Sequence, residues 1–178
     1  MTNINDIIWL EEVKSTNEHI RSHIDELDNL SVVAAVCQFA GRGQGNHSWH
    51  SEPGKNLTFS MLVKQPAVTP RQQEQISQDV ANCIISLLNS YGIQAWIKPP
   101  NDIWVEDKKI CGILIEHSLR GNRISWTIIG IGLNVNQISF PEDLPNPTSM
   151  ALEGAPNNDI KEVLHKLINI FSKLSWLK

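Results

Sequence analysis

The feature that most constrains the fold is a pair of apolar segments separated by a tight turn. Residues 109–119 (KICGILIEHSL) and 123–130 (RISWTIIG) have the β-branched composition that is typical of strands. Gly121-Asn122 between them is a favourable two-residue turn for a β-hairpin. The sequence therefore predicts an antiparallel pair of strands in the second half of the chain.

The other segments predict strands and helices around this hairpin. The strongest helical pattern runs from Pro70 to Tyr91, because Thr69 can cap it, Gln72 completes a capping box and Gly92 ends it. Further helices are expected from Ser15 or Thr16 to about Leu30 and from about Asn158 to Leu174, and further strands at residues 7–13, 32–39, 56–64, 94–98 and 103–106. This order predicts an α+β (mixed α/β) domain with a mixed, largely antiparallel sheet and helices packed on one side.

Composition limits the class of protein. The 178 residues fit one domain, and a hydrophobic fraction of 41% is sufficient for a sizeable core. The net charge of −4 argues against nucleic acid as a partner, and no apolar run approaches the roughly 18 residues that span a membrane. Cys37, Cys83 and Cys111 are far apart and lack CxxC spacing, so we expect reduced, buried thiols in a cytoplasmic protein.

Residues 40–51 (AGRGQGNHSWHS) have neither a helical nor a strand period. Asn46 replaces the third glycine of a dinucleotide fingerprint, and the lysine-serine ending of a P-loop is missing. His47 and His50 lack further ligands at a convincing zinc spacing. The segment is therefore either an ordinary surface loop or a mobile lid that brings the cation of Arg42 to an anion.

Three more clusters have both a structural and a chemical interpretation. Residues 98–102 (KPPND) form a stiff corner whose polar side chains either bond locally or hold phosphate oxygens and a magnesium ion. Lys109 begins an apolar strand, and Gly112 leaves space for a ligand to approach that strand. Residues 130–134 (GIGLN) expose backbone at a strand end, and Asn134 offers a donor and an acceptor that can read a nucleobase.

Taken in order, these motifs resemble the biotin protein ligase family. The motifs that carry the resemblance lie between about residues 7 and 136 and are Ser15-Thr16-Asn17, Gln38, Gly41-Arg42-Gly43, Trp49, Lys98-x-Pro100-Asn101-Asp102, Lys109-x-x-Gly112-Ile113-Leu114 and Gly130-x-Gly132-x-Asn134. The resemblance implies that family's catalytic-domain fold, which is like that of class II aminoacyl-tRNA synthetases. It also implies a ligase that uses ATP to activate biotin as biotinyl-5′-AMP and transfers it to a lysine of a biotin carboxyl carrier protein.

The resemblance further implies a role for each site residue. Lys109 and Arg42 are the expected catalytic residues, and Asp102 is the expected magnesium ligand. Biotin binding is expected of Ser15, Thr16, Asn17, Gln38, Arg42, Gly43, Gln44, Lys109 and Gly112, and ATP or AMP binding of Trp49, Lys98, Asn101, Asp102, Gly132 and Asn134. ATP and Mg²⁺ act together with the substrate biotin, and no tightly bound prosthetic group is expected.

The chain departs from the family pattern in places. Pro99 stands where tryptophan is usual, and Gln44 stands where some members have a second arginine. Residues 1–178 are expected to be the catalytic domain alone, without an N-terminal helix-turn-helix and with the small C-terminal β-barrel absent or truncated.

The expected carrier belongs to acetyl-CoA carboxylase or another biotin-dependent carboxylase. A homodimer is compatible with the family, and neither nucleic acid nor a membrane is an expected partner. Two alternatives stay open: a lipoate–protein ligase with the same fold, and a non-catalytic regulator that binds biotin or a nucleotide. The polar residues 15–17 favour a ureido ligand over an apolar dithiolane, and the presence of Lys109 and Arg42 favours a catalyst.

Overall fold

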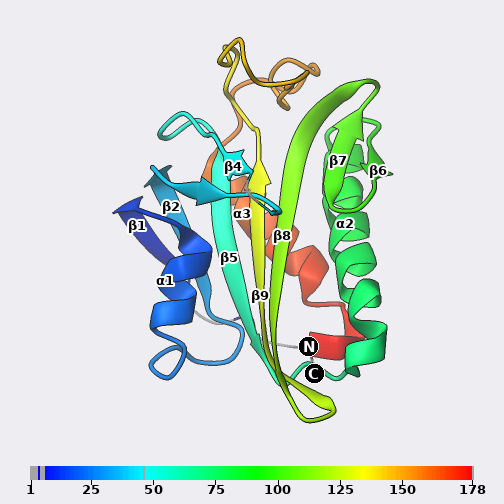
Figure 1. Cartoon of the computed structure of the whole chain (residues 1–178). Coiled ribbons are helices and arrows are strands. Elements are labelled where there is room, and N and C mark those ends of the chain that lie inside the picture. Colours follow the sequence, from blue (N-terminus) through cyan, green and yellow to red (C-terminus); the bar gives the residue numbers. More distant parts are fainter. Residues whose placement is uncertain (1–3, 5–6, 46, 178) are drawn as a thin grey trace.

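The computed structural model describes residues 4, 7–45 and 47–177, and across them a seven-stranded sheet forms the centre of the molecule (Figure 1). Its strands, in spatial order, are β1 (Ile7–Val13), β2 (Val32–Gln38), β5 (Leu57–Lys64), β9 (Arg123–Leu133), β8 (Lys108–Arg120), β7 (Asp102–Val105) and β6 (Trp96–Lys98). The β1–β2 pair is parallel and the other pairs are antiparallel. The expected mixed, largely antiparallel sheet is confirmed.

The predicted hairpin is the longest pairing in the sheet. Strands β8 and β9 pair from Arg120 and Arg123 beside the turn as far as Cys111 and Leu133. Gly121 in the turn has a φ of +62°, a conformation that glycine adopts without strain. Strand β9 extends three residues beyond the predicted end at residue 130, because it also pairs with β5 along its whole glycine-containing end.

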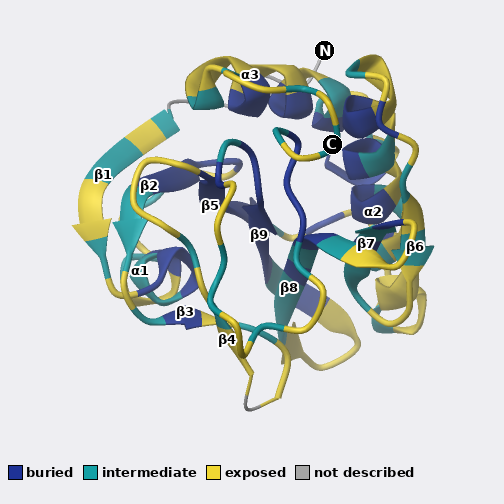
Figure 2. Ribbon diagram, turned by 90° about the horizontal axis from the view of Figure 1, so that it is seen from above, coloured by how far each residue is buried: buried dark blue, intermediate teal, exposed yellow. Residues whose placement is uncertain are grey.

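Two long helices cover one face of the sheet. Helix α2 (Gln73–Ser90) follows one 3₁₀ turn, η1 (Pro70–Gln72), and α3 (Ile160–Phe171) comes near the end of the chain before a second turn, η2 (Ser175–Leu177). The side-chain carbonyl of Gln72 accepts from the backbone N–H of Thr69 at 3.1 Å, which is half of the predicted capping box. Both helices carry buried residues (dark blue in Figure 2), and these belong to the same main core as the buried residues of the inner strands.

The short helix α1 (Thr16–Ser22) packs on the opposite face, so the helices do not all lie on one side (Figure 1). Its Ile20 contacts a second, smaller apolar cluster that contains Val33, Leu62 and Ile128. Successive residues of a strand point to opposite faces of the sheet. Val33, Leu62 and Ile128 are each next in sequence to a residue of the main core, so they point to the face away from α2 and α3. This second face of the sheet is the one that carries the candidate site.

The prediction that the first helix extends to about Leu30 is wrong, because α1 ends at Ser22. The Ser22 hydroxyl donates to the Glu18 carbonyl at 2.9 Å, and the His23 N–H donates to the Ile20 carbonyl, which tightens the last turn. The following residues 25–28 contain three acids, which the negative end of a helix dipole disfavours.

Two further sequence expectations can be compared with the structure. Cys83 and Cys111 are buried as expected, but Cys37 near the end of β2 is only half-buried. Among the described residues no helix is both long enough and apolar enough to cross a membrane.

Candidate functional site

The site lies over a patch of sheet that has no side chains of its own. Gly112 on β8 pairs with Gly132 on β9, and Gly130 lies two residues before Gly132 on the same face. A Cβ atom on Gly130 would lie 2.2 Å from the Asn17 side-chain oxygen, and one on Gly132 would lie 2.3 Å from the Trp49 ring. The three glycines therefore create the floor on which Asn17 and Trp49 rest.

One end of the site is a buried set of polar groups at the start of α1. Ser15 is the N-cap, as predicted, and its hydroxyl accepts from the Glu18 N–H at 3.5 Å. The Gln38 side-chain carbonyl, at the end of β2, accepts from the N–H of Thr16 at 2.9 Å. The Ser60 hydroxyl, which is fully buried on β5, donates to the Asn17 side-chain oxygen at 2.5 Å. These bonds hold the donors and acceptors of this end in fixed directions.

Glu116 on β8 connects this polar end to the segment above it. Its Oε2 atom accepts from the Asn17 amide nitrogen at 2.9 Å, and its Oε1 atom lies 3.5 Å from Arg42 Nη1. Arg21 of α1 forms a second ion pair with the same carboxylate. Sequence reasoning did not single out Glu116, because its partners are far away along the chain. One signal was available in the sequence: Glu116 follows Gly112 by four residues in the same strand, so both point to the same face of the sheet.

The other end of the site is charged. Lys109 Nζ at the start of β8 lies 2.8 Å from Asp102 Oδ1 on β7. The neighbouring Asn101 is bound to β8 twice, since its carbonyl accepts from the Ile113 N–H at 2.9 Å and its amide donates to the Ile113 carbonyl at 2.6 Å. The proline-containing corner is therefore fastened to the strand that carries Lys109.

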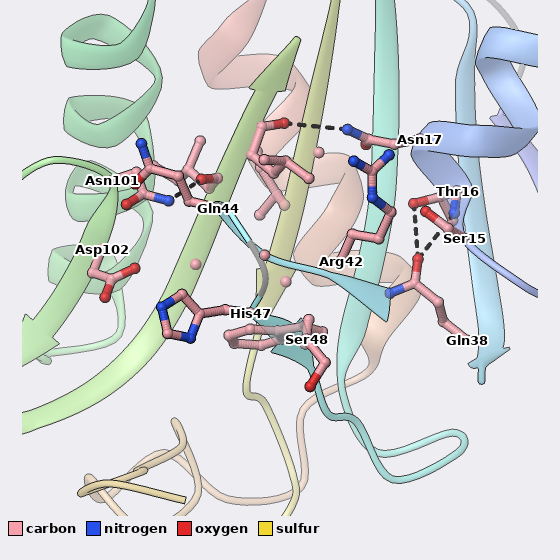
Figure 3. A pocket seen from close by; sticks show the side chains of 18 of the residues that line it. Ser15, Thr16, Asn17, Gln38, Arg42, Gln44, His47, Ser48, Asn101 and Asp102 are labelled. Atoms are coloured by element: carbon pink, nitrogen blue, oxygen red, sulfur yellow. Dashed lines mark hydrogen bonds between the residues drawn. The ribbon is translucent and has the colours of Figure 1, made fainter. Parts of the chain in front are cut away.

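Residues 40–51 cover the floor as a small hairpin and not as an irregular loop. Strand β3 (Gly41–Arg42) pairs with β4 (Ser48–Trp49), and the Gly43 N–H donates to the His47 carbonyl at 2.8 Å. Asn46 lies outside the described residues. We call residues 41–45 and 47–49 the lid, because Arg42, Gln44, His47 and Ser48 of this segment line the cavity (Figure 3).

The resulting cavity has a volume of about 260 Å³. The sequence-predicted residues that line it are Ser15, Thr16, Asn17, Gln38, Arg42, Gly43, Gln44, Trp49, Asn101, Asp102, Lys109, Gly112 and Gly132. Lys98 is not among them, because its Nζ lies 3.4 Å from the centre of the Trp104 ring. Some lining residues had been given no binding role from the sequence. They include His47, which was set aside as part of an unconvincing zinc motif, and Leu114 and Gly130, which belong to the recognised motifs and share the face of Gly112 and Gly132.

Asn134 lies in an adjoining cavity of about 300 Å³ on the other side of Trp49 and Lys109. The rest of its lining comes from His47, Ser48 and His50 on one side and from Phe140, Asp143, Leu144, Pro145 and Pro147 on the other. The Asn134 amide nitrogen donates to the Thr148 carbonyl at 2.8 Å, while its side-chain oxygen is buried with no partner in the described part of the chain. Trp49 Nε1 is buried and unpaired in the same way. Unpaired buried polar atoms of this kind are costly unless a ligand bonds to them.

Comparisons with known proteins agree with this fold. Residues 9–134 match the model of the biotin/lipoate A/B protein ligase family. The chain is 34% identical over 147 residues to the bifunctional ligase/repressor BirA of Bacillus spizizenii, which covers 80% of this chain and 45% of BirA. The fold matches a biotin protein ligase from Aquifex aeolicus in complex with biotin and ATP, with a TM-score of 0.79, 29% identity, and coverage of 94% and 69% of the two chains.

A biotin protein ligase from Leishmania major in complex with biotinyl-5-AMP is similar too, with a TM-score of 0.77, 25% identity, and coverage of 94% and 74%. The fold of this chain is thus similar to that of biotin protein ligases solved with biotin and ATP or with biotinyl-5-AMP. The chain belongs to the biotin/lipoate A/B protein ligase family. It spans about half the length of the curated relatives that it matches, since the match covers 45% of BirA.

Proposed function

We propose that this protein activates biotin with ATP to give biotinyl-5′-AMP and pyrophosphate, and then transfers biotin to a lysine of a biotin carboxyl carrier protein. One observation supports this most directly. A single cavity joins a buried, hydrogen-bonded polar end to the Lys109–Asp102 end over a glycine floor. This arrangement suits a ligand with a polar head group, an apolar middle and a carboxylate.

The polar end is the proposed site of the ureido ring. Ser15, Thr16, Asn17 and Gln38 supply both donors and acceptors there, and all but Gln38 are buried. Thr16 and Gln38 bond to each other, and Ser15 and Asn17 bond to neighbouring residues, so these groups are fixed before a ligand arrives. Less ordering entropy is then lost on binding. The biotin chain then lies over Gly112 and Gly130 with its carboxylate toward Lys109.

The adjoining cavity is the proposed site of the adenine. The unpaired side-chain oxygen of Asn134 is an acceptor for the exocyclic amine of adenine, and Trp49 forms the wall between the two spaces. The nucleotide phosphates would then lie beside Lys109, Asn101 and Asp102. Lys98 is less well placed for this role, because its ammonium group stacks on Trp104.

The residues present are compatible with magnesium only as a partner of the nucleotide. No group of three or more histidine, cysteine or acidic side chains gathers in the described residues, and Asp102 is the carboxylate of the charged end. Mg²⁺ is commonly held by one or two carboxylates together with substrate phosphates and water, and Asp102 fits that arrangement. When bound there, the ion would neutralise part of the phosphate charge.

The chemistry requires two anions to come together. A biotin carboxylate oxygen forms a bond to the α-phosphorus of ATP, and the bond from that phosphorus to the pyrophosphate oxygen breaks. Lys109 supplies a positive charge where the carboxylate and the α-phosphate meet, and the lid excludes water from the mixed anhydride. Arg42 is held by Glu116 at the polar end, so it must leave that carboxylate if it is to act at the phosphate.

The proposed partners and location follow from the same assignment. The acceptor is a carrier protein of acetyl-CoA carboxylase or another biotin-dependent carboxylase, in the cytoplasm.

Strand β7 pairs with β8 only over residues 108–112, so the edge of β8 beyond Ile113 has no partner strand in the part of the chain that the structure describes. An unpaired strand edge supports pairing with a second copy, which is the proposed homodimer.

Biotin-dependent exchange of labelled pyrophosphate into ATP tests the proposal. We expect exchange with biotin and ATP, and none when either is omitted. Exchange with lipoate in place of biotin would indicate the lipoate–protein ligase instead. A chain that binds biotin but catalyses no exchange would be a binding protein, and the proposed activity would be wrong.

A further inference from the structure

A third cavity, of about 390 Å³, shares a wall with the proposed biotin site and has no role in the reaction described so far. It lies between the lid, the first half of α2 and the corner before β7. Gln44, Pro100, Asn101, Ile113 and Leu114 line both this cavity and the site. We call it the side cavity, because it meets the site beneath the edge of the lid.

The shared wall stands close to the reacting end of the site. Asn101 in this wall is fastened to Ile113 by two hydrogen bonds, and Asp102, the next residue, pairs with Lys109 at 2.8 Å. In the proposed function Lys109 marks the position of the biotin carboxyl group. The lid covers the site, and Gln44 and Asn101, which also line the side cavity, lie at the margin of the site (Figure 3). The side cavity therefore adjoins the end of the site where that carboxyl group is placed.

The lining changes from charged and exposed to apolar and buried. Glu74 and Gln78 on α2 are exposed, Ser77 is half-buried, and Ala81 and Ile113 are each only 3% exposed. A lysine side chain has the matching character, with a cationic end on a long apolar stem. A carboxylate at the outer end attracts the ammonium group, while an apolar inner wall favours the neutral amine, which is the nucleophile.

We propose that the side cavity admits the acceptor lysine of the carrier protein, an inference that rests on the proposed function. The lone pair of the neutral amine attacks the acyl carbon of biotinyl-5′-AMP. The C–N bond forms while the bond from that carbon to the phosphate oxygen breaks, AMP leaves with the electron pair, and the amine proton passes to water. Gln44 lies at the boundary between the side cavity and the biotin site, which the lysine side chain has to cross.

The test separates transfer from adenylate formation. Ser77→Leu fills the side cavity from α2, and Gln75→Leu on the same helix is its matched control, because Gln75 is exposed and does not line the cavity. The enzyme is loaded with biotin and ATP, and a single turnover of transfer to a biotin carboxyl carrier domain is followed. We expect Ser77→Leu to slow transfer by about tenfold or more, with pyrophosphate exchange within about twofold of wild type. Gln75→Leu should change neither rate.

A second pair of variants tests the charge at the outer end. Glu74→Gln should raise the KM for the carrier domain by about two- to fivefold and reduce the dependence of that KM on salt, whereas Glu11→Gln on β1 should not. Wild-type transfer rates in Ser77→Leu, together with an unchanged carrier KM in Glu74→Gln, would overturn the inference while exchange stays intact. Absence of exchange in the wild-type protein would overturn the proposed function itself, and this inference with it.

Discussion

The Nζ atom of Lys109 lies 2.8 Å from the Oδ1 atom of Asp102, and this pair places opposite charges at one end of the site on two neighbouring strands. Lys109→Ala removes the cation that the proposed adenylation requires. We expect pyrophosphate exchange to fall by about 100-fold or more, the range seen when one charge-stabilising donor is lost. Lys108→Ala is the matched control, because Lys108 does not line the cavity and its Nζ lies 3.9 Å from Glu153. Equal losses in both variants would argue against a specific role for Lys109.

The Arg42–Glu116 pair predicts how firmly the lid is held before a ligand binds. Glu116→Gln keeps an acceptor for the Asn17 amide but removes the ion pairs with Arg21 and with the half-exposed Arg42 of the lid. Partly exposed pairs contribute about 0.2–1 kcal/mol, so hydrogen exchange of the backbone amides of the lid should become about two- to fivefold faster without ligand. Glu18→Gln, which removes only an exposed pair with Lys14, should leave the lid unchanged. A lid with unchanged protection in Glu116→Gln would show that this contact does not hold it.

The close contacts of the glycine floor predict that even a methyl side chain there lowers the stability of the protein. Gly130→Ala would place a Cβ atom 2.2 Å from the Asn17 side-chain oxygen, which is already bonded to Ser60. We expect the free energy of unfolding to fall by about 1–3 kcal/mol, as is usual for overpacking, and the KM for biotin to rise because Asn17 must move. Ser118→Thr adds one carbon to the same hairpin outside the cavity and is the control. Denaturant unfolding and pyrophosphate exchange measure the two effects, and an unchanged KM for biotin would contradict this account of the floor.

The neutral side chain of Gln44 predicts that the protein holds biotinyl-5′-AMP weakly. This exposed lid residue lines the cavity, and its neutral amide stands where some family members carry an arginine. Gln44→Arg adds a cation near the phosphate, so the off-rate of biotinyl-5′-AMP should fall by about two- to fivefold, as expected for an exposed ion pair. Gln75→Arg adds the same charge outside the cavity and should have no effect. The off-rate is measured by chasing labelled adenylate, and a rate in Gln44→Arg that is no slower than wild type would refute the prediction.

The three thiols should differ in reactivity. Burial, with a smaller contribution from Asp79, raises the pKa of Cys83 to about 11, and burial raises the pKa of Cys111 as well. A raised pKa lowers the thiolate fraction at pH 8, and the thiolate is the reactive form. Iodoacetamide should therefore label the half-buried Cys37 first in the folded protein, as judged by peptide mass spectrometry. Labelling of Cys111 as fast as Cys37 would contradict this order.

Local patterns in the sequence were sufficient to predict much of the fold. The Gly121-Asn122 turn and the apolar segments beside it predicted the β8–β9 hairpin, and the cap at Thr69 predicted where α2 begins to within a turn. The N-cap at Ser15 was also predictable, because its bond is made within four residues. The end of α1 was not, because no glycine or proline among residues 23–30 marks a stop after Ser22.

The site was predictable in its motifs but not in its geometry. The sequence by itself determined which polar, charged and glycine residues are available, because these properties belong to each residue and its neighbours. Only the tertiary structure decided that Glu116 meets both Asn17 and Arg42, that Gly130 and Gly132 leave room for Asn17 and Trp49, and that Lys98 stacks on Trp104 outside the cavity. These relationships depend on strand register and on which face of the sheet α1 covers. Both are set by long-range pairing and burial, which no local pattern contains.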